Sequence, residues 1–161
     1  MAILPIETEH KTTNRILRNR SDEVRDIADP SVQKLIADMH ETLTHTEHGV
    51  ALAAPQVGAN LRIFVVLPDA GVRQTVFINP VITKRSDERV IMDEGCLSTP
   101  GVYGKIERVP MLKVEAQNER GRKFKLKVEG LVAQIVQHEV GHLDGELFID
   151  KAISVRDQQK Q

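Results

Sequence analysis

The chain has 161 residues, and its 22 Lys and Arg nearly balance its 23 Asp and Glu, for a formal net charge of −1. This length suits one domain over residues 1–161 that buries its own core. The balanced charge and the lack of a basic run argue against direct nucleic-acid binding. No apolar run approaches the roughly 20 residues that span a bilayer, and the N-terminus lacks a signal-peptide core, so we expect a cytoplasmic protein without a membrane partner.

The N-terminal part is predicted to be an arm followed by one helix. Residues 1–28 are polar with scattered apolar positions, which indicates an extended arm over the core. Asp29 and Pro30 then form a helix start, because the aspartate can accept hydrogen bonds from the first turn and proline presets φ. Apolar residues recur at helical spacing up to about Thr46. They are Val32, Leu35, Ile36, Met39 and Leu43.

Small apolar residues follow Gly49 in the stretch VALAAPQVG, where Gln56 is the lone polar side chain. Small residues let a backbone approach a ligand or another chain closely. A tight crossing beside the first helix explains the stretch equally well.

Four β-branched or alternating segments predict strands, at residues 61–67, 76–83, 111–116 and 123–128. The last segment alternates Lys with Phe, Leu and Val, which is typical of a half-exposed antiparallel strand. Near the C-terminus, ELFID is predicted to be a closing strand. The polar tail, from about residue 154, is predicted to begin a short helix and fray.

The stretch from Gly130 to Gly145, GLVAQIVQHEVGHLDG, demands a specific chemistry. Residues four apart on a helix share a face, so His138 and His142 can point both imidazoles at one ion. Glu139 projects about 100° around the axis, where it can handle the proton of a water molecule beside that ion. The remaining positions are apolar over an arc too wide for a surface helix, so we expect this helix to be mostly buried.

The same three residues could also share this spacing by accident, each satisfied by hydrogen bonds in a core. Burying them on an apolar helix would cost on the order of several kcal/mol, which a divalent ion would offset. Catalytic sites of this kind have three protein ligands and leave one position open. A third donor is therefore needed elsewhere in the chain.

Cys96 is the best choice for the third ligand. Few residues follow His142, and none of them is a histidine, so the donor is expected upstream. Cys96 lies in MDEGCLSTPG, where Gly95 permits a sharp backbone and Pro100 interrupts strand structure. A thiolate is a natural partner for two imidazoles on zinc or ferrous iron. The alternative is a buried, inert cysteine.

Three segments, GVALAAPQ at 49–56, EGCLS at 94–98 and QHEVGH at 137–142, resemble in order and spacing the signature motifs of the peptide deformylases. These enzymes remove the formyl group from nascent polypeptides. The resemblance covers nearly the whole chain and implies a single catalytic domain with an α+β fold, in which antiparallel sheets enclose a central HExxH helix. It implies one divalent metal ion, typically Fe2+, with Zn2+ or Ni2+ able to substitute. The implied partners are N-formyl-methionyl peptides and the ribosome exit region.

The resemblance also implies a role for each matching residue. Cys96, His138 and His142 match the metal ligands, and Glu139 matches the catalytic acid and base.

Other matches surround the metal. Gln56 and the backbone N–H of Leu97 match the donors that hold the formyl oxygen. Glu94 and Arg108 match a supporting ion pair behind the cysteine loop. The residues expected to bind substrate are Gly49, Val50, Ala51, Met92, Leu131, Gln134 and Ile135.

Three positions depart from the family pattern. Ala51 stands where the family usually has glycine, and its methyl group is expected to crowd the strand that lies along the substrate. Gln134 stands at a usually apolar position of the methionine pocket. Gly141 replaces a usual acidic residue and so removes a support for the histidines. Because all three ligands and the glutamate are intact, we expect hydrolase activity; the alternative is a non-catalytic or altered-specificity paralogue that binds metal and peptide.

Overall fold

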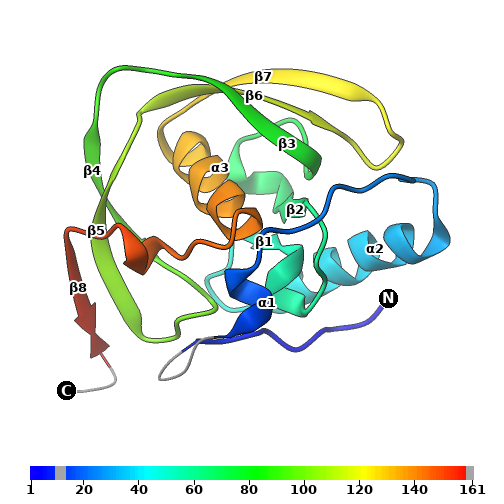
Figure 1. Ribbon diagram of the computed structural model, residues 1–161, viewed down its shortest axis with the longest axis horizontal. Coiled ribbons are helices and arrows are strands. Elements are labelled where there is room, and N and C mark those ends of the chain that lie inside the picture. The colour runs from blue at the N-terminus through cyan, green and yellow to red at the C-terminus, as the bar shows by residue number, and fades with distance from the viewer. Residues whose placement is uncertain (10–13, 159–161) are drawn as a thin grey trace.

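Two antiparallel sheets surround a central helix in the computed structural model, which describes residues 1–9 and 14–158 (Figure 1). The larger sheet has the order β1-β2-β3-β6-β7, with β1 (Ala51–Ala53), β2 (Ile63–Val66), β3 (Val76–Arg85), β6 (Met111–Gln117) and β7 (Lys123–Glu129). The smaller sheet has the order β4-β5-β8, with β4 (Val90–Gly95), β5 (Val102–Arg108) and β8 (Ser154–Asp157). The α-helices are α1 (Arg15–Arg18), α2 (Pro30–Thr44) and α3 (Gly130–Leu143). Short 3-10 turns are η1 (Ala54–Val57), η2 (Pro68–Ala70) and η3 (Phe148–Asp150).

Strands β1, β2 and β3 form a layer between two helices, with α3 on one face and α2 on the other. Because side chains alternate across a strand, Phe64 and Phe77 pack in the core on the α3 side. Ile63 and Val65 pack with the buried face of α2. The central strands are therefore apolar at consecutive positions, and all four residues of β2 are buried. This double-sided packing gives α3 a rigid support.

The predicted helix after Asp29 is confirmed as α2. The Asp29 side chain accepts a hydrogen bond from the N–H of Ser31, and Pro30 occupies the first turn. Both contributions lower the cost of starting the helix. The predicted helix from Gly130 is confirmed as α3, and Gly145 after it adopts a left-handed φ of 80°. A side chain at Gly145 would also meet the Arg18 backbone, so glycine is required there for two reasons.

The four predicted strands are confirmed as β2, β3, β6 and β7, and the half-exposed pattern of β7 is confirmed as well. Two predictions for the C-terminus were wrong. ELFID does not form a strand, because the Asp150 carboxylate accepts from the N–H of Leu147 at 3.0 Å and closes the 3-10 turn η3. The tail does not start a helix either, because residues 154–157 pair with β5 as β8. Gly104 on β5 allows this, since a Cβ there would lie 2.6 Å from the Ser154 carbonyl oxygen.

The predicted N-terminal arm lies along the molecule, interrupted by the short helix α1; its residues 10–13 fall outside the described part. The N–H of Glu7 donates to the Gln56 carbonyl oxygen, and the N–H of Glu9 donates to that of Ser98. Arg18 then binds the carboxylates of Glu9 and Asp150. The arm is thus fastened to two segments that were singled out by their motifs. Within the described residues, we find no helix with the length and apolar character needed to cross a membrane.

Candidate metal centre and active site

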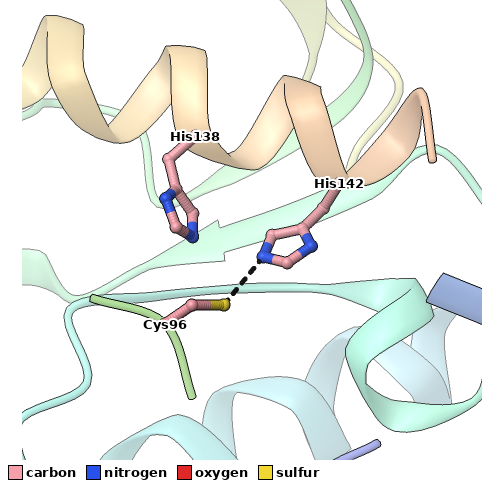
Figure 2. Close-up of side chains that lie close together, drawn as sticks. All are labelled: Cys96, His138 and His142. Carbon is pink, nitrogen blue, oxygen red and sulfur yellow. Dashed lines mark hydrogen bonds between the residues drawn. The ribbon is translucent and has the colours of Figure 1, made fainter. Parts of the chain in front are cut away.

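The three predicted metal ligands converge on one point. Figure 2 shows the imidazoles of His138 and His142 directed from α3 toward the Cys96 sulfur. One ligand atom of each residue lies within 4.8 Å of the other two, and Cys96 Sγ is 3.2 Å from His142 Nε2. No second cluster of this kind occurs in residues 1–9 and 14–158.

The chemistry of these donors fits a divalent ion. Burial alone would raise the pKa of the Cys96 thiol, but the His142 and His138 imidazoles lower this pKa well below its usual value. The sulfur is therefore favoured as a thiolate, which is the form that binds metals. A thiolate with two imidazoles is a donor set found for zinc and iron. These three residues could therefore hold the metal that the motif predicts.

Glu139 lies beside this cluster in a setting that suits proton exchange. The residue is 4 % exposed, and its Oε2 atom has no hydrogen-bond partner among the described residues. Burial raises the pKa of the Glu139 carboxyl, and the His138 and His142 rings oppose that shift only in part. A carboxyl with a raised pKa exchanges protons more readily near neutral pH.

A buried ion pair orients one of the two histidines. Arg108 donates to both oxygens of Glu94, from Nε at 2.9 Å and from Nη2 at 2.5 Å. Glu94 Oε1 lies 2.5 Å from His138 Nδ1. Burial alone would raise the pKa of Glu94, but Arg108 and His138 lower it to about 2. The ionised carboxylate fixes the ring so that the other nitrogen, Nε2, can face a metal.

Two hydrogen-bond donors border the cysteine. Gln56 is 2 % exposed, and its Oε1 accepts from the N–H of Ala53 at 2.9 Å, which fixes the orientation of the amide. Its Nε2 lies 3.1 Å from Ser98 Oγ and 3.7 Å from Cys96 Sγ. The backbone N–H of Leu97 has no acceptor in the described part of the chain. Both donors are thus placed beside the three-residue cluster.

A cavity of about 640 Å³ opens onto the site. Of the residues predicted to bind substrate, six line it: Gly49, Val50, Ala51, Leu131, Gln134 and Ile135. Met92 does not; it is half-buried on β4, opposite Ile106 of β5. Ile6 and Tyr103 also line the cavity, although neither could be predicted from the sequence. Neither belongs to a motif, because the arm and β5 reach the site only through the tertiary fold.

The structure shows what surrounds Ala51 and Gly141, two of the three positions that depart from the family pattern. Ala51 is 8 % exposed, packs in the core on the α3 side and borders the cavity. A Cβ at Gly141 would meet only Glu146, at 3.9 Å, so no steric conflict requires glycine at that position. Nothing in the structure explains the choice of glycine at 141.

Comparisons with known proteins agree along almost the whole chain. A family model described as polypeptide deformylase matches residues 5–158. Peptide deformylase 1 of Bacillus cereus is 44% identical over 151 residues, which cover 94% of this chain and 93% of the relative. A peptide deformylase of Pelotomaculum thermopropionicum is 42% identical over 143 residues, covering 89% of each chain.

Solved structures show the same similarity. The crystal structure of the peptide deformylase from Thermotoga maritima has a TM-score of 0.86 and 38% identity, and covers 96% of this chain and 100% of that one. The enzyme from Synechococcus elongatus, in complex with actinonin, has a TM-score of 0.85 and 35% identity, and covers 94% of this chain and 79% of that one.

Antiparallel sheets around an HExxH helix that faces a cysteine define a metal-dependent hydrolase. The comparisons then select one branch of that class. This chain belongs to the peptide deformylase family. The predicted α+β fold and the predicted enzyme class are confirmed, and the comparisons give no support to the non-catalytic alternative.

Proposed function

We propose that this enzyme removes the N-formyl group from the initiator methionine of nascent polypeptides and releases formate. The observation that supports this most directly is the convergence of Cys96, His138 and His142 beside Glu139 at the end of an open cavity. Peptides that emerge from the ribosome would be the substrates. The enzyme would therefore act in the cytoplasm, and its partners would include the ribosome exit region.

Cys96, His138 and His142 would hold one divalent ion. We propose Fe2+ as the native ion, with Zn2+ or Ni2+ as substitutes, because a thiolate and two imidazoles suit each of these metals. When bound, the ion would supply Lewis acidity, which polarises the formyl carbonyl and lowers the pKa of water.

The side chains around the ion would carry the proton transfers. Glu139 would accept a proton as water adds to the formyl carbon, and would return it to the amine nitrogen as the C–N bond breaks. Its raised pKa supports this role, because it makes the carboxylate a stronger base than an ordinary glutamate. The products are formate and a free α-amine. Gln56 Nε2 and the N–H of Leu97 would donate to the oxyanion that forms on the way.

The cavity walls would bind the peptide. β1 is an edge strand that pairs with β2 alone, so residues 49–51 can present backbone groups to an extended chain. Leu131 and Ile135 project from α3 into the same cavity and would contact the methionine side chain. The ion pair of Glu94 and Arg108 would hold the His138 ring in the orientation that binds the metal.

The test is formate release from a formyl-methionyl tripeptide by protein purified anaerobically with Fe2+. The Glu139→Gln variant keeps the shape of the side chain and removes its basicity. We expect turnover to fall by roughly 10²- to 10⁴-fold, with bound iron, measured by elemental analysis, unchanged. Equal formate release by both proteins at equal iron content would overturn the proposal.

A further inference from the structure

Gln134 is a polar side chain on the wall of the cavity. It lies one helical turn before His138 on α3 and lines the cavity together with Leu131 and Ile135. Because its side chain is half-buried, it needs hydrogen-bond partners to offset the partial loss of hydration. The hydrogen-bond acceptors of the Gln134 side chain indicate its role.

The amide nitrogen of Gln134 reaches across to the end of β4. It donates to the Asp93 carbonyl oxygen at 2.9 Å and to Glu94 Oε2 at 3.3 Å. The first bond fastens α3 to the strand that leads into Cys96. The second holds the carboxylate whose other oxygen binds His138 Nδ1. One side chain therefore contacts the supports of two different metal ligands.

Strand β4 has few other attachments to α3. It is an outer strand of its sheet and forms backbone hydrogen bonds with β5 alone. In the described residues, its side-chain hydrogen bonds to α3 are those of Gln134 and the Glu94–His138 pair. Without Gln134, the Glu94–His138 pair would be the one side-chain hydrogen bond left between the described residues of β4 and α3.

We propose that Gln134 is a positioning residue: by holding β4 and the Glu94 carboxylate against α3, it sets the distance between the Cys96 sulfur and the His138 ring. The inference rests on the proposed function only in taking these two residues as metal ligands. An apolar residue at 134 would make the cavity wall more apolar, but it would remove the hydrogen bonds to β4 and leave this strand freer to move away from α3.

The test uses Co2+ in place of the native ion, because its absorption spectrum reports ligand geometry and its release to a chelator can be timed. Gln134→Leu removes the whole amide, and Gln134→Met keeps a side chain of similar length but removes both donated hydrogen bonds without adding a charge beside Glu94. The matched control is Gln137→Leu on the same helix. Gln137 bonds to the backbone of Val109 and to no metal ligand.

We expect both Gln134 variants to shift the thiolate–Co2+ and ligand-field bands and to release Co2+ about 10- to 100-fold faster, the range typical for residues that support metal ligands. The Gln137→Leu protein should keep the parent spectrum and release rate, even if it unfolds at a lower temperature. Parent-like spectra and rates in the Gln134 variants would overturn the proposal, as would equal changes in Gln137→Leu, which would indicate general loosening of α3. If Gln134→Leu fails to fold, Gln134→Met decides the question. The spectra do not depend on formate release, so an enzyme inactive on formyl peptides would still test the role of Gln134.

Discussion

Glu94 Oε1 lies 2.5 Å from His138 Nδ1, and both oxygens of the same carboxylate accept hydrogen bonds from Arg108. The Glu94 carboxylate that orients the histidine ring is thus itself fixed by two hydrogen bonds from Arg108. The carboxylate side chain is 6% exposed and the histidine side chain 11%, so water does little to weaken this contact.

The first prediction concerns this contact. Replacing Glu94 with Gln keeps the shape but removes the charge that faces His138 and Arg108. Substitutions that disturb the support of a metal ligand typically weaken metal binding by about 10- to 100-fold, so we expect a loss of that size. Competition with a chromogenic chelator measures it. The surface variant Asp93→Asn serves as the control, because among the described residues the Asp93 carboxylate pairs only with the exposed Lys105. Equal losses in both variants would contradict the role of Glu94.

A second prediction concerns the donors to the oxyanion. Gln56→Glu keeps the acceptor for the Ala53 N–H but removes the donated hydrogen bond. Loss of one such donor typically lowers kcat by about 10²- to 10³-fold, and we expect this with metal content unchanged. Steady-state formate release with parallel elemental analysis measures both quantities. The same change at Gln33, which bonds to backbone carbonyl oxygens far from the metal ligands, should leave kcat as it is.

The features that could be predicted from sequence share a local cause. The HExxH spacing places two imidazoles on one helix face whatever surrounds the helix, and the rings of His138 and His142 do lie close together. Cys96 followed from the lack of any later histidine. Residue type and spacing are enough to predict these features.

The features that were missed depend on contacts between distant segments. β8 is a polar strand whose pairing depends on Gly104 of β5, far away in the sequence. Ile6 and Tyr103 line the cavity only because the arm and β5 are folded against it. Met92 was expected there because of its apolar side chain, yet its place on β4 keeps it outside the lining. No local pattern encodes these positions.

A third prediction concerns pH and the N-terminal arm. Arg18 binds the carboxylates of Glu9 and Asp150, and the hydrogen bond with Arg18 lowers the pKa of Glu9 below its ordinary value of 4.5. A carboxyl with a lowered pKa stabilises the folded state above the unfolded pKa, and this contribution disappears as the pH falls through the folded value. Arg18→Met should therefore lower the free energy of unfolding by about 1–2 kcal/mol at pH 7. This loss is smaller than for a fully buried ion pair, because the arginine is partly exposed to water.

The difference between Arg18→Met and the parent should shrink progressively as the pH is lowered below about 4.5. Urea unfolding at a series of pH values measures it. Arg20→Met is the control, since its pair with Asp144 is more exposed, with a 70% exposed arginine side chain. A stability difference for Arg18→Met that stays constant down to pH 3 would show that packing, not charge, fastens the arm.

The last prediction tests whether Ala51 crowds the substrate. Its methyl group borders the cavity at the edge strand β1, so Ala51→Gly should widen the groove and lower KM for a formyl-methionyl tripeptide, while kcat stays the same. Glycine in a strand costs about 0.5–1 kcal/mol of stability relative to alanine, so the unfolding temperature should fall. Ala53→Gly is the matched control, because Ala53 lies on the same face of the same strand, is fully buried and does not line the cavity. It should lower the unfolding temperature in the same way without changing KM. If both variants change KM equally, the effect comes from a loosened strand and the methyl group of Ala51 does not restrict the substrate.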